Sequence, residues 1–137
     1  MKSDEISYIK ETLNFLKGKY DVVIFGSYVD GGMRPNSDID IAVISKQTEK
    51  KLNIKLWKNL LGKAPVKFDL RIFELLPIYI QISIIENYKI IFGDLLEISE
   101  YFYQYRKKWD DCKNRILMNQ FKNIDEKLKL LERRISH

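Results

Sequence analysis

The feature that most constrains this chain is the stretch of residues 26–43, a glycine-rich segment that leads into an alternating one. The preceding residues 22–25 form a continuous apolar run, which is typical of a buried strand. Beyond the glycines, Ile39 and Ile41 alternate with Asp38 and Asp40, which is the period of a strand. The pattern predicts two strands joined by a loop, with both aspartates on one face of the second strand and the isoleucines directed into the core.

The chemistry of this stretch indicates a site for a metal ion and a phosphate. Two carboxylates fixed side by side repel each other, and a divalent cation between them removes the repulsion. Gly26 and Ser27 begin the loop and offer backbone N–H groups and a hydroxyl to an anion. Together these features indicate nucleotide chemistry. The structural alternative is that Asp38 caps a turn and Asp40 is a solvated strand residue.

The same residues follow the pattern Gly-Ser-x3-Gly-x5-Ser-Asp-x-Asp. This pattern resembles the signature of the DNA polymerase beta-type nucleotidyltransferase superfamily. In so short a chain it looks most like the minimal nucleotidyltransferases (MNT), many of which are antitoxins paired with HEPN-domain toxins. The match covers residues 26–43 directly and the chain to about residue 92 more loosely.

The resemblance implies a metal-dependent enzyme that transfers AMP from ATP to a hydroxyl, with a tyrosine of a HEPN toxin as the acceptor. It implies two Mg²⁺ or Mn²⁺ ions bound by Asp38, Asp40 and a third carboxylate on a neighbouring strand. Asp69 is the best candidate, because it alternates with apolar residues in the segment 66–73 and so lies on its polar face. The alternative role for Asp69 is a structural ion pair with Lys67 or Arg71.

The resemblance also assigns the triphosphate of the nucleotide to Gly26 and Ser27. Arg34 is a further candidate phosphate ligand, although an exposed loop arginine is a common structural alternative. Ser37 is a nucleotide-binding candidate that could equally cap the turn into the strand. The chain departs from the family pattern before the next glycine, where the family often has basic residues and this chain has Tyr28, Val29 and Asp30. The acidic Asp30 would repel a triphosphate. The phosphates could then be bound by other cations, for which the candidates are Lys46, Lys67 and Arg71.

The rest of the sequence predicts a single catalytic core followed by a helical extension. Helices are expected at residues 3–16, 48–61 and 78–87, and strands at 22–25, 38–44, 66–73 and 88–92. The fold class is therefore α/β (α+β), a small mixed sheet flanked by helices. We expect residues 1–94 to form the core and residues 95–137 a long helical extension. The helix at 48–61 is expected to turn a set of apolar residues inward: Leu52, Leu56, Trp57 and Leu60.

The extension carries an apolar seam that includes Phe102, Tyr105 and Trp109. A single long helix cannot bury such a seam by itself, so we expect an interface with a toxin or with a second copy in a homodimer. The alternative is that its first half folds back onto the core. An apolar tail also suits a second function, that of a non-catalytic antitoxin which binds its partner with a vestigial nucleotide site.

The composition fits these expectations and excludes other classes. The 137 residues suffice for one domain, and no apolar run is long enough to cross a membrane. The N-terminus is too polar for a signal peptide, and the single Cys112 suits a reducing compartment, so a cytoplasmic protein is expected. The net charge of +5 is attributed mainly to solvated lysines, and no direct nucleic-acid partner is expected.

Overall fold

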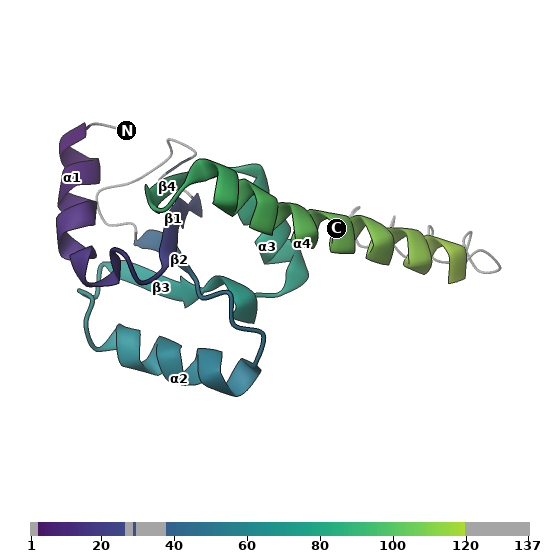
Figure 1. Ribbon diagram of the computed structural model, residues 1–137, viewed down its shortest axis with the longest axis horizontal. Coiled ribbons are helices and arrows are strands. Elements are labelled where there is room, and N and C mark those ends of the chain that lie inside the picture. The colour runs from purple at the N-terminus through teal and green to yellow at the C-terminus, as the bar shows by residue number, and fades with distance from the viewer. Residues whose placement is uncertain (1–2, 27–28, 30–37, 120–137) are drawn as a thin grey trace, which may run out of the picture.

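A computed structural model describes residues 3–26, 29 and 38–119 of the chain (Figure 1). Each predicted strand and helix is present in this part, with shifts of a few residues at the ends. In chain order the elements are α1 (Ser3–Thr12), η1 (Asn14–Leu16), β1 (Asp21–Phe25), β2 (Ile39–Ile44), α2 (Lys50–Leu61), β3 (Phe68–Ile72), η3 (Phe73–Leu75), α3 (Ile78–Glu86), β4 (Tyr88–Phe92) and α4 (Leu95–Asn119).

The four strands form one mixed sheet in the order β3-β2-β1-β4. Strand β1 is antiparallel to both of its neighbours, whereas β2 and β3 run parallel. The register places Asp21 of β1 opposite Ile44, and Phe25 opposite Asp40. The end of β1 therefore meets the beginning of β2, as the loop between them requires.

Alternation along the strands sends side chains into two separate hydrophobic clusters, one on each face of the sheet. The first cluster joins strand residues such as Val22 and Ile41 to α1 and the end of α2. The second joins Val23 and Ile44 to α3 and α4. Helices thus cover both faces, as Figure 1 shows, and the mixed α/β class predicted from the sequence is confirmed.

Two details of the predicted elements are wrong. Leu52 is 46% exposed, and the inner position of α2 is taken by Asn53, whose amide donates to the carbonyl of Gln47 and whose carbonyl accepts from the Ser45 hydroxyl. A polar residue is buried there because it completes the hydrogen bonds of the loop that enters α2. Val66 lies outside β3 and is exposed, since a turn closed by the amide of Phe68 precedes the strand.

Helix α4 packs on the core with its first half. Ile98 and Phe102 are buried in the second cluster, and the Phe102 ring lies 4.8 Å from that of Phe73 between centroids. The fold-back alternative for this half is therefore the arrangement observed. Farther along, Trp109 is half-buried and Cys112 is exposed, and α4 extends well beyond the body of the protein (Figure 1).

Among the described residues, none of the helices combines the length and the apolar character needed to span a membrane.

Candidate active site

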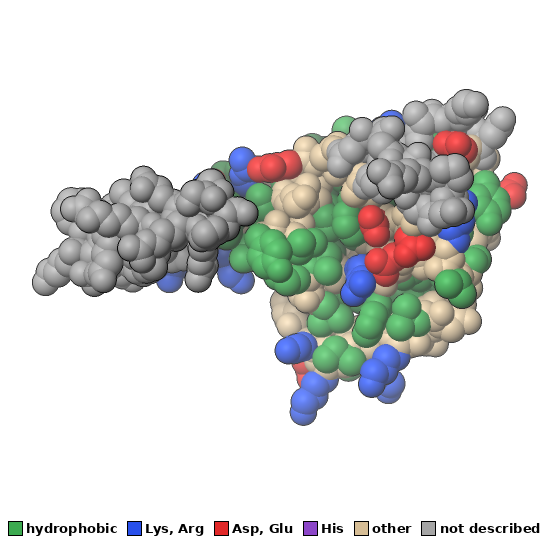
Figure 2. Space-filling view, turned by 180° about the vertical axis from the view of Figure 1, so that it is seen from behind, with side chains coloured by type: hydrophobic (Ala, Val, Ile, Leu, Met, Phe, Trp, Pro, Cys, Tyr) green, Lys and Arg blue, Asp and Glu red, His purple; other side chains and the backbone are tan. Residues whose placement is uncertain are grey.

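The three predicted carboxylates lie together at one end of the sheet. Asp38 immediately precedes β2, and Asp40 is the register partner of Asp69 on the parallel neighbour β3. By alternation, Asp40 and Asp69 share the face that α3 and α4 cover farther along the strands. In the space-filling view, acidic side chains gather beside a basic one, with apolar side chains around them (Figure 2).

The electrostatics of Asp40 are those of a carboxyl group among like charges. Its partial burial raises its pKa above the ordinary value of 3.8, and the nearby charges of Asp69 and Asp38 raise it further. The guanidinium of Arg71 opposes this effect, while a hydrogen bond that the protonated Asp40 donates to the carboxylate of Asp69 adds to it. The protein thus holds Asp40 in a position that disfavours its charge, which is the condition that a bound cation would relieve.

Asp69 takes part in two interactions at once. Its Oδ1 accepts a hydrogen bond from Nε of Arg71 at 3.1 Å, so the ion pair expected as the structural alternative does form. The same carboxyl group also lies beside Asp40. Asp69 is therefore both a partner of Arg71 and a member of the acidic group. The two interpretations of the sequence are compatible.

The donor chemistry of this group fits a hard divalent cation, because carboxylate oxygens are the ligands that Mg²⁺ and Mn²⁺ prefer. The arrangement is not that of a finished metal site. Within residues 3–26, 29 and 38–119, no three acidic, histidine or cysteine side chains are placed so that all could bind one ion.

Gly26 occupies a backbone conformation that explains why a glycine follows β1. Its φ is +77°, in the left-handed region, and a Cβ at this position would collide with the carboxylate of Asp40. The amide of Val29 donates to its carbonyl at 3.1 Å and closes a turn. The sequence pointed to Gly26 as a residue that lets a phosphate approach the backbone. The structure adds that it also makes room for Asp40.

Among the other predicted site residues, only Lys67, Lys46 and Arg71 can be placed. Ser27, Arg34 and Ser37 fall outside the described residues. Lys67 lies at the acidic end, because its carbonyl accepts from the amide of Ile39.

Lys46, considered above as a substitute phosphate ligand, is at the wrong end of the sheet. It lies 3.4 Å from Asp21, whose strand partner is Ile44. Asp40 is four residues back along β2 from that partner, about 13 Å away at the usual strand rise. Lys46 is only six residues from Asp40 in the sequence, but an extended strand separates residues by about 3.3 Å per position.

The sequence pattern gave too little weight to the ion pair between Arg71 and Asp69. The signal was present, since Asp69 and Arg71 are two residues apart on one strand and so share a face. The pair was treated as an alternative to a functional carboxylate. The structure shows that the pair forms while Asp69 also lies beside Asp40.

Comparison with known proteins agrees with this geometry. A family model described as a nucleotidyltransferase domain matches residues 6–91. A Methanocaldococcus jannaschii protein that carries the name "Putative protein adenylyltransferase" is 43% identical over 114 residues, which are 83% of this chain and 88% of the relative.

Solved structures with the same fold come from toxin–antitoxin complexes. One is a toxin–antitoxin complex with AMP-PNP, whose matched chain has a TM-score of 0.57 and 21% identity, with 90% of this chain and 98% of that chain covered. Another is a tri-AMPylated Shewanella oneidensis HEPN toxin in complex with an MNT antitoxin. It has a TM-score of 0.57 and 18% identity, with 93% and 99% of the two chains covered. At these identities the likeness shows the shared fold.

Proposed function

Because this chain belongs to the nucleotidyltransferase domain family, we propose that it is a metal-dependent enzyme that transfers AMP from ATP to a tyrosine of a HEPN-domain toxin and thereby acts as an antitoxin. The observation that carries the proposal is the meeting of Gly26, Asp40 and Asp69 at one end of the sheet. The name of the archaeal relative supports a protein acceptor, and the AMPylated toxin complex with the same fold supports a HEPN partner. The exposed, unpaired Cys112 agrees with action in the cytoplasm.

The reaction replaces one bond to the α-phosphorus with another. The acceptor oxygen bonds to the α-phosphorus of ATP, the bond from that phosphorus to the bridging oxygen breaks, pyrophosphate leaves, and the hydroxyl proton passes to solvent. Two Mg²⁺ or Mn²⁺ ions, when bound by Asp38, Asp40 and Asp69, would supply neutralisation of the phosphate charge and activation of the acceptor hydroxyl.

The chain's own residues have separate tasks in this scheme. Gly26 lets the backbone come close to the phosphates, and Asp40 lies directly against it. Arg71 lies 3.1 Å from Asp69, so it is placed to bind a phosphate oxygen once that carboxylate turns to a cation. Ser27, Arg34 and Ser37 are proposed as further nucleotide ligands on the basis of the sequence pattern.

The second candidate is a non-catalytic antitoxin that neutralises its partner by binding alone. Two observations favour it. The described part of the chain contains no assembled group of three metal ligands, and Asp30 places a negative charge in the loop assigned to the triphosphate. Under this alternative the acidic group is a remnant, and the interaction surface carries the function.

Transfer of labelled AMP separates the two candidates. The chain is incubated with α-³²P-labelled ATP, Mg²⁺ and a purified HEPN-domain protein. The wild type and Glu49→Gln, an acid-to-amide change of an exposed side chain just before α2, should label the partner, whereas Asp40→Asn should not. An Asp40→Asn protein that labels the partner at the wild-type rate rejects the metal role, and a wild type without labelling favours the non-catalytic antitoxin.

Nucleotide binding provides a test that needs no partner. Calorimetry with a non-hydrolysable ATP analogue should give heat that depends on Mg²⁺, and the double variant Asp38→Ala, Asp40→Ala should abolish it. Absence of Mg²⁺-dependent heat at millimolar nucleotide would count against the site.

The outer part of α4 is the surface that we propose for the partner. In this division residues 1–94 form the catalytic core and residues 95–137 the extension, whose first turns complete the core through Ile98 and Phe102. The C-terminal end of α4 extends beyond the body of the protein (Figure 1), and Trp109 in its outer half is half-buried. A chain truncated after Ile116 should lose its partner, or its dimer, in light scattering. An unchanged assembly would exclude this surface.

A further inference from the structure

A pocket lies at the end of the sheet opposite the acidic group. It has a volume of about 500 Å³ and is bounded by the connection from α1 to β1, the end of β2 and the end of β4. Asp21 and Ile44, which are register partners, mark this end, whereas Phe25 and Asp40 mark the other. At the usual strand rise the two ends are about 13 Å apart, so the pocket is separate from the candidate active site.

The lining of the pocket is strongly positive. Four lysines contribute to it, namely Lys10 from α1, Lys17 and Lys19 from the connection, and Lys46 from the end of β2, against the single carboxylate of Asp21. Ile44, Ile91 and Phe92 add apolar surface. Clustering of like charges from three separate elements around one hollow favours an anionic occupant, since each lysine lowers the energy of an anion there.

Lys46 has a left-handed backbone conformation, which is unfavourable for a residue with a side chain. Its φ is +59°, and among the described residues it is the non-glycine residue with a positive φ. Glycine or asparagine adopts this region more easily than lysine does. A lysine at this position therefore indicates a use for its ammonium group.

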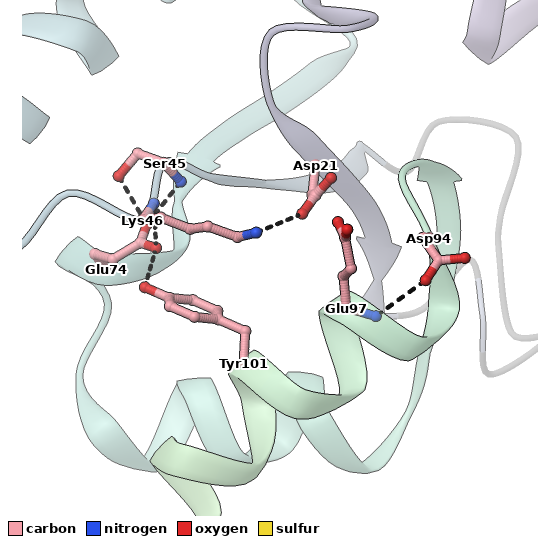
Figure 3. Close-up of polar contacts among 7 residues, drawn as sticks. All are labelled: Asp21, Ser45, Lys46, Glu74, Asp94, Glu97 and Tyr101. Carbon is pink, nitrogen blue, oxygen red and sulfur yellow. Dashed lines mark hydrogen bonds and ion pairs between the residues drawn. The ribbon is translucent and has the colours of Figure 1, made fainter.

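The neighbours of Lys46 fix both its backbone and its side chain (Figure 3). Its amide donates to Oε2 of Glu74 at 2.9 Å, and the amide of Ser45 donates to Oε1 of Glu74 at 3.1 Å. The ammonium group lies 3.4 Å from Oδ2 of Asp21 and 5.9 Å from the centre of the Tyr101 ring. The cation is thus held at the edge of the pocket, and the carboxylate of Asp21 keeps it there when the pocket is empty.

We propose that this pocket binds a small polyanion with two or more phosphate groups, without a metal ion. The volume is that of a typical small-ligand site, and the lysines surround it on several sides, which matches a chain of phosphates better than a single one. A nucleoside triphosphate and an inorganic polyphosphate share this chemistry. The proposal is independent of the nucleotidyl transfer proposed above.

Titration of the full chain in EDTA tests this proposal apart from the active site, because chelation removes the metal ions that the acidic end requires. Tripolyphosphate and ATP serve as the two probes. A pocket variant, Lys17→Gln, Lys19→Gln, Lys46→Asn, should bind both about tenfold or more weakly, with binding that weakens as salt is added. The control variant Lys51→Gln, Lys55→Gln, Lys58→Gln removes the same charge from the exposed side of α2 and should change affinity less than about twofold.

The outcomes separate cleanly. Equal affinity for the two probes would identify the phosphates as the ligand, and tighter binding of ATP would identify a nucleotide. No binding by the wild type in EDTA, or equal weakening in the two lysine variants, would overturn the proposal. Loss of binding in Asp38→Asn, Asp40→Asn would also overturn it, since the ligand would then occupy the active site.

The single variant Lys46→Asn distinguishes a ligand-binding role from a structural one. Asparagine tolerates the left-handed backbone, and the ion pair with Asp21 is half-exposed, so the melting temperature should hold or rise. The affinity for tripolyphosphate should fall several-fold in the same protein. A lower melting temperature with unchanged affinity would show that Lys46 serves the fold alone.

Discussion

The two ends of the sheet are built on opposite electrostatic principles. At one end the register of β2 and β3 holds Asp40 and Asp69 together although their charges repel, and burial raises the pKa of Asp40. At the other end Glu74 accepts hydrogen bonds from the amides of Ser45 and Lys46, and its charge is matched by donors. The repulsion between Asp40 and Asp69 costs free energy that packing elsewhere must offset, whereas the hydrogen bonds to Glu74 stabilise the fold. Removing a carboxylate at the two ends should therefore change stability in opposite directions.

The largest loss is expected for Glu74→Ala. Its Oε1 accepts from the amide and hydroxyl of Ser45, and its Oε2 from the amide of Lys46 and from the Tyr101 hydroxyl at 2.6 Å. Removing the carboxylate leaves the amides of Ser45 and Lys46 and the Tyr101 hydroxyl without this acceptor in a partly buried place, which costs about 2–4 kcal/mol, whereas the Ser45 hydroxyl keeps Asn53 as its acceptor. Urea denaturation measures the free energy of unfolding.

Glu86→Ala is the matched control for this substitution. Glu86 pairs with Arg106 at 3.1 Å on the surface, where an ion pair contributes about 0–1 kcal/mol. Equal losses in Glu74→Ala and Glu86→Ala would show that the hydrogen bonds around Glu74 do not stabilise that end of the sheet.

A smaller loss is expected for Gly26→Ala at the acidic end. Alanine must adopt a φ near +77°, and its Cβ must also displace the carboxylate of Asp40, for a total of about 2–3 kcal/mol. Gly18→Ala is the matched control. Gly18 has a φ of +80°, but a Cβ there would meet nothing within 4 Å, so this change should cost only about 1 kcal/mol. Differential scanning calorimetry of the two variants measures the additional cost of the clash with Asp40. Equal losses of stability would contradict that clash.

The comparison also shows which parts of the molecule could be predicted from sequence. The acidic end was predictable because strand alternation fixes the face of Asp38, Asp40 and Asp69 by local rules. The strand Tyr88–Phe92 was placed correctly for a related reason, since a short apolar run there is bounded by Asn87 and Gly93.

The opposite end was not predictable, because its contacts join residues far apart in the chain. Glu74 meets Lys46 across 28 residues and Tyr101 across 27. Nothing in the local pattern around Glu74 indicates a hydrogen-bonding partner, because its partners come from the end of β2 and from α4. The prediction that Leu52 faces inward was wrong for a similar reason. Asn53 is buried in that place because it completes the hydrogen bonds of the loop before α2, which helical periodicity does not predict.

Tyr101→Phe tests one of the hydrogen bonds around Glu74 by a smaller change. Burial first, and then the hydrogen bond to Glu74, raise the pKa of the Tyr101 hydroxyl, so it stays protonated and donates at all ordinary pH values. Loss of the hydroxyl removes one donor from Glu74 but keeps the ring, at a cost of about 1 kcal/mol. Tyr103→Phe on the exposed side of α4 should cost nothing measurable in the same urea titration, and a similar loss in both would contradict this account.

The smallest effect is a gain, and it belongs to Asp40→Asn in metal-free protein. The folded pKa of Asp40 lies above its ordinary value of 3.8, chiefly through burial and then through Asp69 and Asp38. Folding therefore favours the protonated carboxyl group, so this group's contribution to stability is complete below pH 3.8 and is lost as the pH rises through the folded pKa. Asparagine resembles the protonated form at every pH.

The variant should consequently match the wild type in acid and exceed it at neutral pH, by less than about 1 kcal/mol because Asp40 is half-exposed. Thermal unfolding in EDTA at about pH 3 and about pH 7 measures the two differences. Repeating the neutral experiment with Mg²⁺ and ATP analogue should reverse the order, since ligands that bind only the folded wild type stabilise it alone. A variant that is less stable than the wild type at neutral pH in EDTA would mean that the acidic end is held together by its carboxylates and not in spite of them.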